Sequence, residues 1–452
     1  MMLPAVASDY EAQRVALRNA ILSRVSGASP NQHEVMLSRF GARGDSATDC
    51  HPAFQKAVRY AVKHGGARIV LTKGVWLCKG PVHLADNVTL DIREGAVLRF
   101  VAEPNAFLPV VETSWEGTLL WNYSPFIYGK GLKNVAIIGS GTIDGNAGET
   151  FSRWHAIQER GQLLSREYNH SGVPVMQRRF GEGYYLRPHL IQLYDCEGVT
   201  LSDVFLCNAP FWCIHLLMCR NVVLRGLRYD AKLVNNDGID IESSSDVLID
   251  GVHFNNGDDN IAIKSGRDND GWNLCLPSEN IVVRRCHFKG LHAIVIGSEM
   301  SAGVQNVVVE DCDYAGYCKR GVFVKTNPDR GGFVRNLYIN NVKFGEVLDL
   351  FYVSSMYAGQ GLDNSHFSAI ENIHVDSLSA NKVNGTGLIL QGTKKQPLRN
   401  LTFRRLIADQ VTHGISIDNT EPVLIEDSHL GEPVGIPSQV SAADKIFDQN
   451  NQ

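Results

Sequence analysis

A short apolar strand bounded by polar turn residues recurs about ten times along the chain. Each repeat opens on a turn residue, continues through a few alternating or β-branched apolar positions and closes on another polar residue. Four of these repeats are Asn134-Val-Ala-Ile-Ile-Gly, Asn221-Val-Val-Leu-Arg-Gly, Asp246-Val-Leu-Ile-Asp-Gly and Asn306-Val-Val-Val-Glu-Asp. The repeats start about 22 to 36 residues apart, a period that is typical of a solenoid.

The strand pattern within each repeat predicts a parallel β-helix. A second apolar strand follows the first, as at Ile261-Ala-Ile-Lys, Ala293-Ile-Val-Ile and Val322-Phe-Val-Lys. No helical period of 3.6 residues intervenes, which disfavours βαβ folds and leucine-rich horseshoes. Several strands per coil with inward β-branched side chains predict an all-β solenoid. The Asn residues that open many repeats are expected to stack as a ladder at one turn, with a structural role and no chemistry.

Residues 1–80 differ from the repeats and are predicted to form a short helical N-terminal cap that leads into the first coils. Residues 11–26 have helical apolar spacing, and a second helix is predicted over 52–64, after the turn-rich segment 40–45. We expect this segment to cover the open end of the solenoid, which would otherwise expose unpaired backbone edges.

The β-helix, which we expect to be the catalytic domain, is assigned to residues 81–437. A polar, aromatic-rich insert at 146–188 interrupts the repeat. Inserts in solenoids usually map to loops on the binding face. The C-terminal tail, residues 438–452, is expected to be mobile.

The bulk composition is that of an ordinary globular protein. The net charge of -5 predicts no nucleic-acid or membrane partner. No apolar run approaches the roughly 20 residues of a transmembrane helix, and the N-terminus lacks the basic and apolar regions of a signal peptide. The 10 cysteines form no CxxC pair, which argues against a zinc site. Buried free thiols are the favoured interpretation, and disulfide bonds are the alternative.

Two acidic stretches, each at the end of a strand-like segment, carry the candidate chemistry. They are Asn235-Asn-Asp-Gly-Ile-Asp and, one coil later, Gly257-Asp-Asp. Because residues one repeat apart lie above one another in a stacked coil, Asp237, Asp258 and Asp259 are expected to gather on one face. Clustered carboxylates repel one another and push one pKa upward. Cleavage of a glycosidic bond needs one protonated carboxyl and one ionised carboxylate. A metal site and a purely structural cluster are the alternatives.

Four motifs follow one another in a fixed order. They are Asn-x-Asp-Gly-Ile-Asp from Asn235, Gly-Asp-Asp-x-Ile-Ala-Ile-Lys-Ser-Gly-Arg-Asp from Gly257, His-x-x-x-Ile-Gly-Ser-Glu from His292 and Arg-Gly-x-x-x-Lys from Arg320. In this order they resemble glycoside hydrolase family 28, the polygalacturonase family of pectin-degrading enzymes. The resemblance runs from about Phe40 to about Ile425 and implies a right-handed parallel β-helix. It also implies inverting hydrolysis with no metal or other cofactor.

The resemblance implies a role for each matched residue. Asp258 would be the general acid that protonates the leaving oxygen, while Asp237 and Asp259 would hold and activate the attacking water. His292 would tune the acid, and Lys325 would bind a substrate carboxylate. Asp240 and Lys264 are expected to be supporting or turn residues.

Further residues are candidates for substrate contact. Phe323 stands where the family usually has an Arg. It would offer an apolar face to a sugar, and the uronate carboxylate would be bound more weakly than with Arg. Arg320 would replace the missing charge only if its loop turns inward. Arg267 is a substrate contact or a structural turn residue, and Tyr357 occupies the place of a substrate-contacting Tyr. Four other aromatic residues stack on sugar or pack within the protein: Trp115, Tyr123, Trp212 and Trp272.

The predicted function is inverting hydrolysis of α-1,4-galacturonosidic bonds in pectin-type polysaccharide. The segment from Ser265 to Trp272 and the 146–188 insert resemble the exo-acting branch of the family. One alternative, motivated by Phe323, is the same chemistry on rhamnogalacturonan or another modified uronate oligosaccharide. The alternatives from another class are a polysaccharide lyase and a non-catalytic carbohydrate-binding β-helix. The resemblance implies a secreted or periplasmic protein, and a solenoid of this size is expected to be a monomer.

Overall fold

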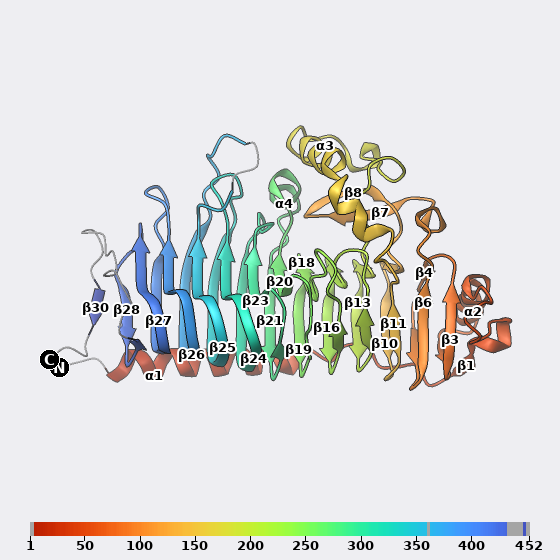
Figure 1. The fold of residues 1–452 in the computed structure, drawn as a ribbon, viewed down its shortest axis with the longest axis horizontal. Helices are drawn as coiled ribbons and strands as arrows, with labels where there is room; N and C mark the ends of the chain where they lie inside the picture. The colour runs from red at the N-terminus through yellow and green to blue at the C-terminus, as the bar shows by residue number, and fades with distance from the viewer. Residues whose placement is uncertain (1–3, 359–361, 432–445, 449–452) are drawn as a thin grey trace.

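The chain forms a long solenoid of stacked coils (Figure 1). In this computed structural model, residues 4–358, 362–431 and 446–448 are described. Strands of successive coils pair in parallel and in register, as in the run Val199, Val222, Val247 and Ile281. Crossover connections between parallel strands are right-handed. The prediction of a right-handed parallel β-helix is confirmed.

Three ladders of strands run along the solenoid. The first contains β1 (Glu34–Met36), β2 (Ala67–Leu71), β5 (Val88–Ile92), β10 (Lys133–Ile138), β13 (Glu197–Ser202), β16 (Arg220–Arg225), β19 (Ser245–Asp250), β21 (Ser278–Arg284), β28 (Val423–Glu426) and β30 (Ile446–Asp448). The second contains β4 (Val82–His83), β9 (Ile127–Lys130), β12 (Ile191–Tyr194), β15 (Ile214–Leu217), β18 (Ile239–Glu242), β20 (Asp259–Lys264) and β23 (His292–Gly297). The third contains β3 (Gly74–Cys78), β6 (Ala96–Phe100), β11 (Thr142–Asp144), β14 (Phe205–Cys207) and β17 (Arg228–Asp230).

In the later coils a single long strand serves all three ladders, because bridges from Arg228 to His253 and from His253 to His287 lead the third ladder into its middle. These strands are β24 (Val304–Lys325), β25 (Phe333–Ser354), β26 (Ala369–Gln391) and β27 (Arg399–Asp418), and the two-residue strands β22 (His287–Phe288) and β29 (His429–Leu430) pair with the middle of β24 and of β27. Of the predicted tail 438–452, only β30 lies within the described residues, and it pairs with β28.

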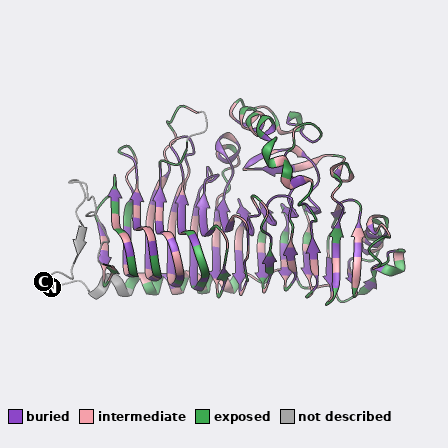
Figure 2. Cartoon of the chain, in the orientation of Figure 1, coloured by how far each residue is buried: buried purple, intermediate pink, exposed green. Residues whose placement is uncertain are grey.

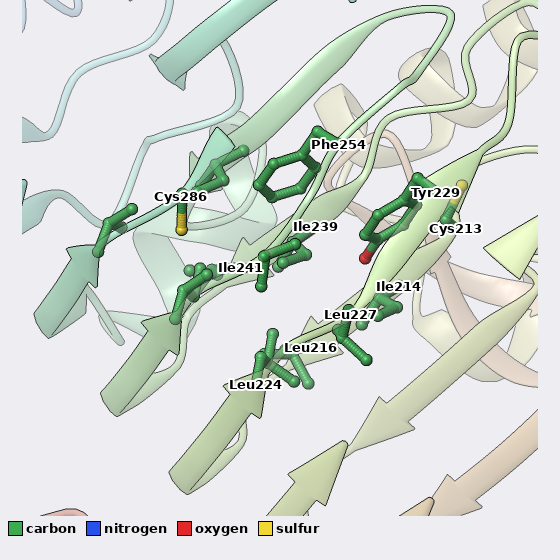
Figure 3. Close-up of a cluster of buried hydrophobic side chains, with 14 of the residues drawn as sticks. Cys213, Ile214, Leu216, Leu224, Leu227, Tyr229, Ile239, Ile241, Phe254 and Cys286 are labelled. Atoms are coloured by element: carbon green, nitrogen blue, oxygen red, sulfur yellow. The ribbon is translucent and has the colours of Figure 1, made fainter. Parts of the chain in front are cut away.

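Buried residues recur along the strands from one end of the solenoid to the other (Figure 2), and their apolar side chains form one continuous core. On the second ladder, one fully buried column of register partners comprises Ile214, Ile239, Ile261, Ile294 and Val322. Figure 3 shows part of this packing around Ile239 and Ile241. Because side chains alternate along a strand, the residues between these inward positions point outward, and this outer face carries the polar groups of the site.

The asparagine ladder predicted from the repeats is present. Each amide donates to the side-chain oxygen of the preceding coil, at 2.9 Å from Asn336 to Asn306, 3.2 Å from Asn372 to Asn336 and 2.7 Å from Asn400 to Asn372. Asn336 has φ 57°, in the left-handed region that Asn tolerates better than most residues. These residues hold the turns, as expected. All ten cysteines are free and most are buried, which confirms the interpretation as free thiols.

The two N-terminal helices lie in different places. Helix α2 (His51–Lys63) packs against β2 and β4 at the N-terminal end of the solenoid. Helix α1 (Pro4–Arg24) runs along one side of the stack, where Ile21 packs with residues of several coils, among them Val223, Val282 and Val308 (Figure 1). The expectation that the whole segment covers the open end is therefore wrong for α1, whose apolar stripe covers a side face instead.

A wall of non-repetitive elements stands over one part of the second ladder (Figure 1). It comprises the hairpin β7 (Val111–Trp115) and β8 (Thr118–Asn122), the insert elements η3 (Phe151–Ala156), α3 (Glu159–His170) and η4 (Val175–Gln177), and α4 (Asp268–Leu274). Two further 3-10 turns, η1 (Leu37–Phe40) and η2 (Pro104–Phe107), lie near the N-terminal end. Among the described helices none is long and apolar enough to span a membrane.

Helix α3 packs against β8 and α4, and buried polar contacts join these elements. The Asn169 side chain donates to the Arg267 carbonyl at 3.0 Å, and Arg178 pairs with Asp270 at 2.6 Å. The 146–188 insert is therefore packed against β8 and α4 and fixed there.

Candidate active site

A cavity of about 350 Å³ opens on the outer face of the second ladder, beside the wall. Its lining comprises Glu116, Arg166, Phe211, Trp212, Asn235, Asp237, Asp258, Asp259, Lys264, Arg267, Leu291, His292, Ser298, Glu299, Lys325 and Tyr357. All four predicted catalytic residues are in this set, with three of the four predicted substrate-binding residues. Phe323 is the exception.

Successive coils place the acidic and basic groups side by side. Asp259 opens β20 and His292 opens β23, and the two are register partners. Asp237 and Asp258 lie in the turns that precede β18 and β20, and Lys325 ends β24. Stacking thus brings residues from four coils into one cavity. The repeat predicted this for the three aspartates, and the family resemblance added His292 and Lys325.

Glycine makes the tight turns of the two acidic motifs possible. A Cβ at Gly238 would lie 2.5 Å from the Asn260 carbonyl oxygen, and a Cβ at Gly257 would lie 2.3 Å from the Leu233 carbonyl oxygen. Both distances are too short for any side chain. The turns also bond to their neighbours, since the Gly238 amide donates to the Asp259 carbonyl at 2.9 Å. The acidic residues are therefore held on a rigid backbone.

Asp259 is the ionised member of the cluster. It is 1% exposed, yet Lys325 Nζ lies 3.1 Å from Oδ2 and His292 Nδ1 lies 2.6 Å from Oδ1. Burial alone would favour the protonated form, but Lys325 and His292 together lower the pKa of Asp259 below its ordinary value. The resemblance assigns His292 to the acid, whereas its hydrogen bond runs to Asp259.

Asp258 is a carboxyl that can hold a proton at mildly acidic pH. Its Oδ1 accepts the Asp259 amide at 3.0 Å, and its Oδ2 accepts a bond of 3.3 Å from Asn235 Nδ2. Burial and the negative charge of Asp259 raise the pKa of Asp258 to about 6. Two adjacent residues thus have pKa values displaced in opposite directions, which is the arrangement that separates an acid from a base.

Asp237 lines the same cavity one coil before this pair and is 4% exposed. Burial, followed by the charges of Asp240 and Asp258, raises the pKa of Asp237 well above its ordinary value. Its Oδ1 has no hydrogen-bond partner among the described residues. A buried acceptor without a partner is costly, so this oxygen is suited to a water molecule or a substrate hydroxyl in the cavity.

A second cluster of buried charged residues lies on the side of the cavity that is nearest the wall. Lys264 Nζ lies 3.0 Å from Glu299 Oε2 and 3.8 Å from Asp240 Oδ1, and Arg267 lies 2.9 Å from Glu299 Oε1. Although burial favours the protonated acid, Lys264 and Arg267 lower the pKa of Glu299 well below its ordinary value. Asp240 is fully buried and outside the cavity lining, whereas Lys264 is buried but lines the cavity. Their supporting role stays a prediction.

Arg267 also bonds to the β7–β8 hairpin of the wall. Its side chain is 1% exposed, and its Nε donates to the Glu116 carbonyl at 2.8 Å. These contacts hold the β7–β8 turn against the coil, so the structural interpretation accounts for Arg267 even though the residue lines the cavity.

Two functional neighbours were not anticipated from the sequence. Glu299, the partner of both Lys264 and Arg267, ends the His-x-x-x-Ile-Gly-Ser-Glu motif and could have been found there. Arg187 is fully buried and donates to Asn235 Oδ1 at 2.7 Å, while Asn235 in turn bonds to Asp258. Its contact with the site arises from folding of the insert, and no sequence spacing signals it.

Phe323 does not present its ring to the cavity, which corrects the prediction of a substrate contact. It is 3% exposed and stacks on Tyr352 with ring centroids 5.0 Å apart. The Arg320 guanidinium lies 4.6 Å above the ring, and Lys325 Nζ lies 5.7 Å from it. Phe323 is a platform for two cations. Arg320 lies over this platform and 3.5 Å from Asp349.

The other aromatic candidates divide between cavity and packing. Tyr357 is 38% exposed and lines the cavity, 5.8 Å from Lys325 Nζ. Trp212 lines the cavity but is 4% exposed, with Lys264 Nζ 4.9 Å from its ring. Trp115, Tyr123 and Trp272 pack against Phe211, Trp154 and His366 respectively and do not line it.

One group of described side chains could offer three donors to a cation. Asp258, Asp259 and His292 bring their ligand atoms within 4.8 Å of one another. The donor set fits a metal poorly, because Lys325 already neutralises Asp259 at 3.1 Å and His292 Nδ1 is bonded to the same carboxylate. A divalent ion would face an ammonium in direct contact with one of its ligands, so we derive no step through a metal.

The sequence and the fold are similar to those of known proteins. The sequence matches the family described as Glycosyl hydrolases family 28 over residues 81–423. It is 29% identical over 393 residues to the probable polygalacturonase of Vitis vinifera, covering 83% of this chain and 74% of that protein. It is 26% identical over 331 residues to the endo-polygalacturonase of Pectobacterium carotovorum subsp. carotovorum, covering 70% and 74%. The crystal structure of a hyperthermoactive exopolygalacturonase from Thermotoga maritima aligns with a TM-score of 0.85 at 33% identity, covering 91% of this chain and 96% of that one.

Proposed function

The chain belongs to glycosyl hydrolases family 28, and on this premise we propose that it hydrolyses α-1,4-galacturonosidic bonds of pectin-type polysaccharide, with inversion and from chain ends. The observation that carries the proposal is the opposite displacement of two neighbouring pKa values, with Asp258 raised to about 6 and Asp259 lowered. Glycosidic cleavage requires one protonated carboxyl and one ionised carboxylate.

Asp258 acts as the general acid. Its proton passes to the glycosidic oxygen as the bond from that oxygen to the anomeric carbon breaks, so the leaving sugar departs as a neutral alcohol. The raised pKa keeps this proton available at mildly acidic pH. Arg187, which bonds to Asn235, supports the acid by fixing the amide that contacts Asp258 Oδ2.

Asp259, assisted by Asp237, acts on the water. A water bound between them attacks the anomeric carbon from the face opposite the leaving oxygen and gives up a proton to a carboxylate, so the configuration inverts. Lys325 and His292 keep Asp259 ionised for this task, and the unpartnered Oδ1 of Asp237 supplies a second acceptor that orients the water. His292 is thus a positioning residue that acts through Asp259.

Lys325 and Tyr357 bind the substrate. The Lys325 ammonium lies in the cavity beside the catalytic carboxylate, where it can also contact a uronate carboxylate. Tyr357 provides an exposed ring next to it. Arg166, on α3, is a further cation in the lining. These groups support an acidic sugar as substrate.

The wall supports action from chain ends. Glu116, at the turn of the β7–β8 hairpin, and Arg166, on α3, line the cavity on the side of the earlier coils. Figure 1 shows these elements standing over that part of the solenoid. The cavity is therefore closed on one side, which suits the terminal sugar of a chain. Because pectin is an extracellular polymer, we also propose that the protein works outside the cytoplasm, and we propose that it is a monomer.

Reducing-sugar release with product sizing, on polygalacturonate and rhamnogalacturonan side by side, tests the proposal. Monomer from polygalacturonate is the expected product, and a ladder of oligomers would refute exo action. Turnover of rhamnogalacturonan alone would shift the substrate to the second candidate, which the absence of the family Arg at position 323 favours. Ultraviolet absorbance from a new double bond would indicate a lyase. Nuclear magnetic resonance of freshly released sugar checks inversion.

A further inference from the structure

A second hollow lies next to the catalytic cavity, on the side of the later coils. It encloses about 660 Å³, and its lining comes from the loops that follow β24, β25 and β26 and from the end of β27. Met356 lines this groove, and its neighbour Tyr357 lines the catalytic cavity. A single segment of chain thus borders both hollows, and Figure 1 shows the loops after β25 and β26 rising from the same edge of the solenoid as α4.

The strand register gives the direction and the distance. Lys325, Ser354, Gln391 and Asp418 are partners on successive strands, with Lys325 in the catalytic cavity and the last two in the groove. Strands lie about 4.8 Å apart, so Gln391 is roughly 10 Å from Lys325 along the solenoid. An oligosaccharide, and not a single sugar, spans that distance.

The groove carries uncompensated positive charge. Lys394 and Lys395 are exposed in its lining, and neither ammonium has an ion-pair partner among the described residues. Asp418 is the one carboxylate of the lining, so two cations face one anion. Lys395 Nζ lies 5.0 Å from the ring of Phe367, which is half-buried. Ammonium groups beside an aromatic face suit a chain of acidic sugars, whose carboxylates and apolar ring faces both need partners.

We propose that this groove binds the polyuronate chain on the leaving-group side of the scissile bond, with Lys394 and Lys395 contacting carboxylates of sugars beyond the one held at Lys325. This inference rests on the proposed function. Since the wall closes the cavity toward the earlier coils, the rest of a polymer bound by its end leaves the cavity toward the later coils and passes into the groove. The groove therefore sets a preference for long substrates.

The test compares kcat/KM for digalacturonate and hexagalacturonate in the variant Lys394→Gln/Lys395→Gln. The loss is expected to grow with substrate length, so that the hexamer-to-dimer ratio of kcat/KM falls about 5- to 10-fold, the combined effect of two exposed ion pairs. Lys56→Gln/Lys63→Gln on α2, at the other end of the solenoid, removes the same charge and is the matched control. Thermal unfolding of both variants checks that folding is intact.

Salt provides a second measurement. In the wild type the hexamer-to-dimer ratio of kcat/KM is expected to fall as NaCl rises from 0.05 to 0.5 M, because salt screens the attraction between the lysines and the substrate carboxylates. In the lysine variant this attraction is absent, so the ratio is expected to stay low at every salt concentration. An unchanged ratio in the variant, or an equal change in the α2 control, overturns the groove as a binding site. A wild-type enzyme that turns over neither oligomer overturns the proposed function, and this inference with it.

Discussion

Replacement of Lys325 by Met is expected to destabilise the protein in a strongly pH-dependent way. The Lys325 ammonium lies 3.1 Å from Asp259 Oδ2, and the two side chains are 13% and 2% exposed. At an effective dielectric constant of about 20, unit charges at that distance attract by about 5 kcal/mol. Desolvation offsets part of this, and breaking a buried pair costs about 3–5 kcal/mol. We therefore expect about 3–5 kcal/mol less stability for the variant at pH 7.

The sign of the pH dependence follows from the pKa of Asp259. In the wild type this pKa is lowered, so the carboxylate contributes stability above its unfolded pKa of about 3.9 and loses it as pH falls through the folded value. Without Lys325, burial and the neighbouring carboxylates raise the pKa, and the folded variant must take up a proton. The cost of that proton grows by about 1.4 kcal/mol per pH unit, so the loss is expected to be smaller at pH 4 than at pH 7. The remaining part, which comes from the lowered wild-type pKa, is expected to disappear only as pH falls below 4.

Urea unfolding at pH 7 and pH 4 measures this difference. Lys325→Arg keeps the charge and is the control, and it is expected to lose about 1 kcal/mol or less at both pH values. An equal destabilisation of the Met variant at pH 7 and pH 4 would show that the lysine stem, and not its charge, stabilises the site. That result would refute the assignment of Asp259 as the residue kept ionised by Lys325.

Four further predictions concern catalysis. Asp258→Asn is expected to lower kcat about 10²- to 10⁴-fold while oligogalacturonate binding, measured by calorimetry, is retained; full activity would remove Asp258 from the role of acid. Because the pKa of Asp258 is raised to about 6, wild-type kcat/KM is expected to fall as pH rises through about 6, and a flat profile from pH 5 to 8 would contradict this. Tyr357→Ala is expected to raise KM about 3- to 10-fold, with Tyr357→Phe close to wild type, as steady-state kinetics would show. Dialysis against EDTA is expected to leave activity unchanged, since Lys325 neutralises Asp259; a loss restored by a divalent cation would overturn the metal-free mechanism.

The repeat allowed the fold and the core of the site to be predicted from the sequence. Strand alternation with a polar turn in each repeat fixes which positions face inward, and stacking then places Asp237, Asp258 and Asp259 on one face without any knowledge of side-chain contacts. Local pattern and coil-to-coil register are sufficient for these three residues. His292 came from the family resemblance, and the structure makes it the register partner of Asp259 one coil later.

Contacts that join distant segments could not be predicted in this way. An amphipathic helix has the same pattern whether it covers the end of a solenoid or its side, so α1 was misplaced. Phe323 occupies an outward strand position, which suggests exposure, but Arg320 and Tyr352 cover its ring. Arg187 reaches Asn235 only because the insert folds back over the coils. In each case the prediction failed because the contact joins segments whose relative positions do not follow from the repeat.

The placement of α1 has a consequence for how the protein unfolds. After the helix, the backbone amides of Gly27 and Ser29 donate to Asn221 and Asn134 at 2.8 and 3.0 Å, so the segment crosses coil after coil in reverse order. In a simple solenoid each coil contacts only its neighbours, and the stack can fray from either end. Helix α1 and the segment after it join coils that are several repeats apart. This adds long-range coupling, so the coils that they cross are expected to unfold together. Helix α1 can then dock only after the later coils have formed, which makes completion of the fold a late event.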